Sequence, residues 1–391
     1  MKKVCEKDKC TGCMACIEVC PRNAIKVEDT LEAYNAVICE DLCINCNACT
    51  RVCQNSNAII TFRKTTAWYQ GWSNDSNDRK NSSSGGAAYE LAKAIINRGG
   101  IVYSCLFFNG EFVFDETNTV PGLKKFSGSK YVKSNPKNIY KRIKERLRMG
   151  TDVMFIGLPC QVAALKCVTG EKDNLYTVDL ICHGTPSPRV LELFLEQYGC
   201  KLEDLKDIQF RVKDQFQVSS KTYKAFTSKF VRDPYMIAFL NGLIYTKNCY
   251  SCKYARRERV ADITIGDSWE SDLPVEIQKK GISLILSQTQ KGDALIHEAN
   301  MELKSVDLEK AVAANHQLRH PSIEPTGRDD FFWLLKKGKR FNTLVRKNYP
   351  KQYTKQKMKA VLSKLGIIGG GTIIDYRIIV QEINREGKPH N

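Results

Sequence analysis

The chain has 391 residues, 42% of them apolar, which is enough for two or three domains with hydrophobic cores. It has no run of 18 apolar residues and no apolar segment behind its N-terminal Met-Lys-Lys, so we expect neither a membrane-spanning helix nor a secretory leader, and we expect a cytoplasmic location. The formal charge is +17, and the 17 cysteines occur in a chain far longer than disulfide-stabilised mini-proteins.

Residues 1–62 contain two copies of one cysteine pattern, Cys-x2-Cys-x2-Cys-x3-Cys, 33 positions apart. In such a run three thiolates wrap one corner of an iron–sulfur cube, and the fourth cysteine reaches the other cube. Two runs therefore predict two [4Fe–4S] clusters and one-electron transfer. We expect the first cluster at Cys10, Cys13, Cys16 and Cys53, and the second at Cys43, Cys46, Cys49 and Cys20.

The alternatives for these runs are a disulfide scaffold or two structural zinc sites. Zinc sites usually take their cysteines two by two, which does not explain three at two-residue spacing twice. Pro21 follows the first run, as in bacterial ferredoxins, whereas Gln54 follows the second. A short β-rich segment also follows each run, at 23–27 and 57–62, so the sequence predicts a two-fold repeat and a small α+β module.

The chain from residue 63 to about 325 alternates predicted strands and helices, which indicates an α/β body. A polar segment over 73–84 indicates a loop, and two glycines then open a helix over 87–97. Further elements are predicted as a strand from Ile101, a helix over 140–148, a strand over 153–157, a helix over 161–167 and a strand over 175–182.

The last part of the chain, from residue 326, is basic. Residues 331–391 hold 14 Lys or Arg against three acidic residues, and helices are predicted over 332–349 and 354–365. Such a tail attracts an anionic partner, either an acidic electron-donor protein or an anionic membrane surface, which would make the protein membrane-peripheral. A solvated basic helix is the plain alternative. No aromatic–basic module supports nucleic-acid binding.

Four cysteines of the body lie at strand ends or in tight loops. Cys160 lies between a strand and a helix, Cys182 ends a strand, and Cys249 and Cys252 form a Cys-x2-Cys pair. Strand ends of an α/β fold face one crevice, so these thiols could hold a third cluster. The spacing leaves open a zinc half-site at the pair and ordinary buried cysteines at the other positions.

A serine–glycine segment precedes the helix at 87–97. Hydroxyls and backbone N–H groups at a helix N-terminus suit a phosphate, as in a flavin dinucleotide, but a serine N-cap explains the same residues. The segment 127–131 is likewise either a turn or a phosphate clamp. The candidate residues are Ser83, Ser84, Gly85, Gly86, Ser129 and Lys130.

Six motifs follow one another in the body. They are SSSGG at 82–86, GSKYVKS at 128–134, GLPCQVA at 157–163, CHGTPSP at 182–188, CYSCKYA at 249–255 and ADITIGDSW at 261–269. In this order, over about 64–320, the chain resembles the beta subunit of coenzyme F420-reducing hydrogenase and formate dehydrogenase. With residues 1–62 it resembles the fused form of that family. The expected parts are then the ferredoxin domain 1–62, an N-terminal-type region 63–145, a C-terminal-type region 146–325 and the basic tail 326–391.

The resemblance implies an FAD beside a [4Fe–4S] cluster, and hydride exchange with coenzyme F420 or another organic acceptor. Carried onto this chain, it implies that Cys160, Cys182, Cys249 and Cys252 hold the third cluster and that the serine–glycine segment, with Ser129 and Lys130, binds the flavin phosphates. Asp262 or Asp267 could replace a thiolate, although a cap or turn is the simpler role. His183 is a candidate for bonding the flavin or moving a proton, or it satisfies a tight turn, and Gln161 is a candidate of the same kind.

These patterns predict an α+β ferredoxin-like module joined to an α/β flavin-binding body, with a basic, largely helical C-terminal tail. The expected function is that of an iron–sulfur flavoprotein oxidoreductase that passes electrons between a ferredoxin-like donor and, through FAD, coenzyme F420 or another acceptor. The alternative is a non-catalytic electron-transfer subunit that wires a partner enzyme, for example in polysaccharide biosynthesis, because some proteins with these motifs resemble that group. The motifs single out no catalytic residue, no acceptor and no direction of electron flow.

Overall fold

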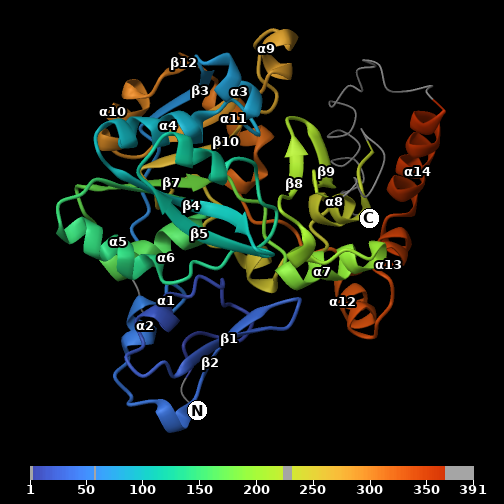
Figure 1. Ribbon diagram of the computed structural model, residues 1–391, viewed down its shortest axis with the longest axis horizontal. Coiled ribbons are helices and arrows are strands. Elements are labelled where there is room, and N and C mark those ends of the chain that lie inside the picture. Colours follow the sequence, from blue (N-terminus) through green and yellow to red (C-terminus); the bar gives the residue numbers. More distant parts are fainter. Residues whose placement is uncertain (1–2, 57–58, 223–230, 366–391) are drawn as a thin grey trace.

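The computed structural model describes residues 3–56, 59–222 and 231–365. Within them a small N-terminal module lies against one side of an α/β body, and further helices, ending in α14 (Pro350–Lys364), lie beside the body (Figure 1). No helix of this described part is both long and apolar enough to cross a membrane.

The N-terminal module is the predicted α+β unit. Each cysteine run carries a short helix, α1 (Ala15–Glu18) or α2 (Ala48–Val52), and β1 (Ile25–Asp29) pairs antiparallel with β2 (Tyr34–Ile38). The strand expected at 57–62 is wrong for residues 59–62, which form no strand; residues 57 and 58 lie outside the described part. The reason is that the chain leaves the module here, and Arg63 forms a β-bridge with Arg259 of the body.

The body is built on one mixed sheet, which has eight strands in the described residues, in the order β12-β3-β11-β10-β7-β6-β4-β5. The four inner strands β10, β7, β6 and β4 run parallel, and antiparallel strands complete both edges. The strands are β3 (Ala67–Ser73), β4 (Ile101–Phe108), β5 (Glu111–Thr117), β6 (Val153–Gly157), β7 (Leu175–Leu180), β10 (Ile263–Asp267), β11 (Ser283–Ser287) and β12 (Met301–Lys304).

Helices cover both faces of this sheet, which is why β6 is buried along its whole length. The apolar faces of α4 (Ala87–Asn97) and α10 (Gln290–Glu298) pack in the core on one face. Those of α5 (Ile139–Arg148) and α6 (Pro159–Thr169) pack in the core on the other, together with Cys13 and Ala15 of the module. The predicted helix over 87–97 and strand over 153–157 are confirmed, while the strand from 175 ends at Leu180.

The loop expected over 73–84 is wrong in part, because α3 (Ser76–Asn81) forms inside it. The carboxylate of Asp75 accepts hydrogen bonds from Asn77 N and Asp78 N, and this N-cap stabilises a short helix in a polar sequence. Two further short helices, α9 (Val275–Lys279) and α11 (Leu308–Ala314), lie near the β10–β12 side of the sheet.

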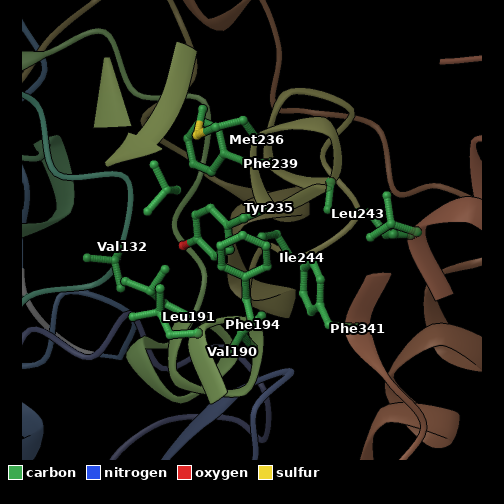
Figure 2. Packing of buried hydrophobic residues seen from close by; sticks show 14 of the residues in the cluster. Val132, Val190, Leu191, Phe194, Tyr235, Met236, Phe239, Leu243, Ile244 and Phe341 are labelled. Carbon is green, nitrogen blue, oxygen red and sulfur yellow. The ribbon is translucent and has the colours of Figure 1, made fainter. Parts of the chain in front are cut away.

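A side lobe beside the sheet has its own core, which Figure 2 shows around Phe194, Tyr235 and Phe341. The Phe194 ring lies 5.7 Å from the Tyr235 ring and 5.5 Å from the Phe341 ring, centroid to centroid. The lobe consists of α7 (Pro188–Leu195), the hairpin β8 (Gln209–Val212) and β9 (Gln215–Ser219), α8 (Pro234–Leu240), α12 (Arg328–Lys336), α13 (Phe341–Asn348) and α14 (Pro350–Lys364).

The basic segment from residue 326 therefore does not begin as a free tail. Helices α12 and α13 bury Phe331, Phe332 and Phe341 in the lobe core. The single helix predicted over 332–349 is broken at Gly338, whose φ of 77° ends α12 and turns the chain into α13. The structure describes the chain only to residue 365, so the rest of the predicted tail lies outside the described residues.

Phe331→Ala should lower the free energy of unfolding by about 3–5 kcal/mol, because the ring is fully buried against Phe341 and its loss leaves a cavity. Trp333, on the same helix, is 61% exposed, so Trp333→Ala is the matched control with an expected change within about 0.5 kcal/mol. Anaerobic urea unfolding of both variants measures the difference. Equal midpoints would show that α12 contributes no core packing.

Candidate iron–sulfur and cofactor site

The two cysteine runs of the module have the same backbone shape. Gly12 and Asn45 occupy equivalent positions with φ of 68° and 56°, and Met14 and Asn47 both have φ of 60° at the start of their helices. Left-handed residues at these two places bend each loop so that successive cysteines face one centre. The sequence repeat is thus also a repeat of local geometry.

The structure brings together the first thiol group, which comprises Cys10, Cys13, Cys16 and Cys53, and buries all four. Burial raises the pKa of Cys13 to about 11. Burial, followed by the nearby Cys13, Cys10 and Cys53, raises the pKa of Cys16. The thiol of Cys5 hydrogen-bonds with Cys10 and Cys53, which raises the pKa of Cys5 and lowers those of its two partners.

The second thiol group, which comprises Cys20, Cys43, Cys46 and Cys49, lies at the outer side of the module. Cys20 packs in the same small core as buried Cys49, and its Sγ accepts a hydrogen bond from Ala24 N at 3.2 Å. Cys43 is half-buried and Cys46 is exposed. This group is therefore closer to solvent than the first.

A third thiol group lies in the body, where Cys160, Cys182, Cys249 and Cys252 line one cavity of about 270 Å³. Cys160 is in the first turn of α6, and Cys182 follows the end of β7. The pair Cys249 and Cys252 comes from a tight turn at Lys247–Ser251. The parallel strands thus deliver thiols to one crevice, as the positions at strand ends predicted.

The thiols of this cavity are costly to ionise by themselves. Burial, and then Cys249 and Cys252, raise the pKa of Cys182 to about 12, and burial also raises the pKa values of Cys160 and Cys252. A centre that contributes positive charge would hold all four as thiolates. The donor set therefore fits an iron–sulfur cluster, whose irons supply that charge.

A single zinc ion and an iron–sulfur cube require different spacings of their thiolates. Across the described residues, no three His, Cys, Asp or Glu side chains converge closely enough to hold one ion. Bonds of about 2.3 Å to one zinc would bring sulfurs within about 4 Å of one another. In a cube each thiolate binds a different iron, so the sulfurs stand farther apart. A cube therefore accepts sulfurs that stand farther apart than a single zinc ion does.

Gln54 joins the module to the body between two of these thiol groups. Its side chain donates to Cys160 O at 2.6 Å and to Thr11 Oγ1 at 3.1 Å, and it accepts a hydrogen bond from the Tyr254 hydroxyl. The residue directly follows Cys53, where the first run has proline instead. The side chain at this departure from the repeat therefore links the loop of Cys53 to the backbone of Cys160.

Arg259 anchors the loop that carries the cysteine pair. Its guanidinium donates to Tyr254 O at 2.6 Å and forms an ion pair with Asp179 at 3.1 Å, with both side chains buried. Asp179 is in β7, the strand that leads to Cys182. The ion pair therefore ties the Cys249–Cys252 loop to that strand. The arrangement holds two walls of the cavity together.

The serine–glycine segment lies on the sheet beside β11 and meets the segment at 127–131. Ser129 N donates to Ser83 Oγ at 3.0 Å, so these two candidates are neighbours. Ser84 Oγ donates to Ile282 O at 2.8 Å, and Gly85 N donates to Ser283 Oγ at 3.1 Å. Gly86, with φ of 99°, is the N-cap of α4. A Cβ at Gly85 would come within 2.6 Å of Ser283 N, which explains the glycine there.

Cations surround this segment. Lys213 Nζ donates to Ser84 O at 2.8 Å, and burial, with Arg79 and Arg211 nearby, lowers its pKa to about 8. Of the cations Lys213, Arg79 and Arg211, only Arg211 forms an ion pair with a carboxylate of the described residues, and its Nη1 lies 2.6 Å from Asp267 Oδ2. Lys130 Nζ donates to Phe126 O and Ser127 O, and burial lowers its pKa to about 8. The surplus of positive charge suits a diphosphate.

Three of the remaining candidates have structural partners. Gln161 Oε1 accepts from Leu158 N and its amide donates to Ser134 Oγ, so both its polar groups are used within the protein. Asp262 accepts hydrogen bonds from the backbone N and the hydroxyl of Thr177, and Asp267 pairs with Arg211, so both carboxylates have partners within the protein. These contacts give all three side chains a structural role.

His183 lies at the cavity itself, beside Cys182. Burial lowers the pKa of the His183 imidazole to about 4. Its Nδ1 lies 2.6 Å from Gln317 Nε2, and the centroid of its ring lies 5.6 Å from that of the His316 ring. Arg211 and Asp267 both act on the charge of His183, so this charged pair lies near its ring. Either role, orienting a ligand or holding a proton, is compatible with this position.

The fold and the grouped thiols define an iron–sulfur redox protein. Residues 150–311 match the family model for the C terminus of the coenzyme F420 hydrogenase/dehydrogenase beta subunit, and residues 6–26 match the 4Fe-4S binding domain. The chain therefore carries the C-terminal domain of this beta-subunit family behind an N-terminal 4Fe–4S binding domain, which confirms the resemblance seen in the motifs.

Among solved structures, the chain is similar to a chain in the xenon-derivatised F420-reducing [NiFe] hydrogenase complex from Methanosarcina barkeri. The two are 20% identical, with a TM-score of 0.46 over 76% of this chain and 94% of that one. No curated protein matches the chain.

Proposed function

We propose that this protein is an iron–sulfur flavoprotein oxidoreductase with three [4Fe–4S] clusters and one FAD. The observation that carries the proposal is the cavity where Cys160, Cys182, Cys249 and Cys252 meet, because residues of the N-terminal module also line it. Lys9, Thr11 and Asn55 contribute to its wall, so the first thiol group lies next to the third. Bound clusters would supply one-electron transfer, and a bound FAD would join it to two-electron hydride chemistry.

The order of the thiol groups supports a direction along the molecule. The second group is nearest to solvent, the first is buried against α6, and Gln54 bridges the first to Cys160. A ferredoxin-like donor would therefore dock on the outer loop around Cys46. Leu42 and Ile44, 45% and 58% exposed, offer an apolar contact surface there.

The residues of the body hold the acceptor side. Ser83, Ser129 and the cations Lys130, Lys213 and Arg79 would bind the phosphates of the flavin. His183, whose pKa of about 4 leaves the ring neutral, would hydrogen-bond a ligand at the edge of the cavity. Coenzyme F420 is the acceptor that the family's name suggests, and another organic acceptor remains equally compatible with these residues.

Anaerobic reduction of the isolated protein tests the proposal. A reduced ferredoxin-type donor should bleach the flavin absorbance, and addition of oxidised coenzyme F420 or another acceptor should restore it with turnover.

The second candidate function is that of an electron-transfer subunit that passes electrons to a partner enzyme. The family's description as a beta subunit favours it. That candidate predicts flavin or cluster reduction without turnover until a partner subunit is added.

A further inference from the structure

Lys133 is a buried lysine in the wall between the first and third thiol groups. It is 4% exposed, and its ammonium donates to Thr11 O at 3.0 Å, in the loop between Cys10 and Cys13. Its backbone N donates to Pro186 O at 2.9 Å, in the segment that follows Cys182. The residue thus contacts the loops of both groups and also lines the cavity.

The charge of Lys133 has no carboxylate partner among the described residues. Lysines are almost never buried unless paired, because an isolated ammonium loses its hydration. Instead of a carboxylate, thiols lie around it: Lys133 lines the same cavity as Cys160 and Cys182, and its ammonium bonds to the loop between Cys10 and Cys13. The Tyr34 ring, with its centroid 5.3 Å from Nζ, adds a further favourable contact.

The module is also shaped to admit this side chain. A Cβ on Gly12 would come within 2.8 Å of Lys133 Cδ, so the glycine between Cys10 and Cys13 leaves room for the lysine stem. The ammonium is therefore held in a fixed place rather than free to turn to solvent.

From this geometry we infer that Lys133 sets the reduction potentials of the first and third clusters as a fixed positive charge shared between them. Each cluster gains one negative charge on reduction, and a fixed cation nearby stabilises that reduced form. The charge also offsets the repulsion between two reduced clusters. The inference rests on the proposed function, since it takes clusters at both thiol groups. Lys133 is a positioning and tuning residue and touches no substrate.

Lys133→Gln tests the inference, because glutamine can keep a hydrogen bond to Thr11 O while the charge is lost. In EPR-monitored redox titrations of the holoprotein, the midpoint potentials of the first and third clusters should fall by at least a tenfold change in the reduction equilibrium, about 59 mV for one electron. The second cluster is the internal control, because Lys133 contacts the loops of the other two groups. Lys133→Arg should restore the potentials.

Lys166→Met is the matched control, because this half-buried lysine has Asp262 and Glu171 as its charged partners instead of thiols. Unchanged potentials in a Lys133→Gln protein of normal iron content would overturn the inference. If the Lys133→Gln protein lost iron, the Lys133→Arg protein should contain the wild-type amount. Iron loss in Lys133→Arg as well would show that the shape of the side chain, and not its charge, supports the clusters, and would overturn the inference. A wild-type protein with only eight irons would instead refute the proposed function, and the predicted shift of the first cluster would still be testable.

Discussion

Replacement of Cys160 by alanine is expected to remove about four iron atoms per chain and to abolish reduction of the flavin by an external one-electron donor. The reason is that Cys160 is a ligand of the proposed third cluster, next to the module. The backbone carbonyl of residue 160 would still accept the hydrogen bond from Gln54, so the substitution removes the thiol without opening the junction. Iron analysis and stopped-flow absorbance measure the two effects.

Cys200→Ala is the matched control, because Cys200 is buried in the side-lobe core and belongs to none of the three thiol groups. It should retain iron and flavin reduction. If the single variant keeps a partly occupied cluster, Cys160→Ala/Cys182→Ala removes two ligands from different elements and should complete the loss. Undiminished flavin reduction by an external donor in Cys160→Ala would contradict the relay.

Loss of the Arg259 side chain should strongly destabilise the folded protein. Arg259→Met leaves the Asp179 carboxylate buried without its charge partner, and breaking such a pair from one side costs about 3–5 kcal/mol. The Cys249–Cys252 loop also loses its anchor at Tyr254 O, so the iron content should fall together with the free energy of unfolding. Anaerobic urea unfolding and iron analysis measure both.

The pH dependence of this variant follows from Asp179. Burial already raises the pKa of this carboxyl, and removal of Arg259 takes away an interaction that opposes the rise. A carboxyl whose folded pKa lies above its unfolded value favours folding at low pH and loses that contribution as the pH rises. The destabilisation should therefore be smaller near pH 5 than at pH 8.

Arg257→Ala serves as the control for Arg259→Met, because Arg257 lies two residues away and its pair with Glu309 is exposed. Such a pair contributes at most about 1 kcal/mol. Equal unfolding midpoints for the two variants would mean that the buried ion pair does not stabilise the loop.

The three thiol groups could be predicted from the sequence, but the N-terminal groups and the group in the body rest on different kinds of information. Within each run, spacing alone decides which thiols share a loop, and the repeated left-handed residues at Gly12 and Asn45 show how local that information is. Cys160 and Cys182 lie far apart in sequence, but both follow parallel strands, whose ends meet at one edge of the sheet. Their positions at strand ends suggested one crevice, and the family resemblance implied that they share a ligand set with Cys249 and Cys252.

The residues that connect the groups could not be predicted in this way. In the sequence, Gln54 differed from the repeat only because it stands where the first run has Pro21. Its hydrogen bond to Cys160 O joins positions 106 residues apart, which no local pattern predicts. Lys133 and Arg259 look like ordinary surface charges in sequence, since nothing local signals that they are buried. Their roles depend on tertiary contacts, which carry no periodic signal.

The basic C-terminal region shows the same limit. Its positive charge predicted a solvent-exposed tail that attracts anionic partners. In the structure, however, Phe331, Phe332 and Leu335 form a buried stripe that packs into the lobe core. Most basic residues of the region follow this stripe, at 336–340 and in α13 and α14, so the charge does not prevent the packing. Net charge describes the surface of a helix and not what its apolar side contacts.

The most direct test of the account is the iron, acid-labile sulfide and flavin content of the protein purified without oxygen. About twelve irons, twelve sulfides and one FAD per chain are predicted, because three thiol groups would each hold a cube and the body would hold one flavin. About eight irons without flavin would contradict the account, since the cavity lined by Cys160, Cys182, Cys249 and Cys252 would then hold no cluster.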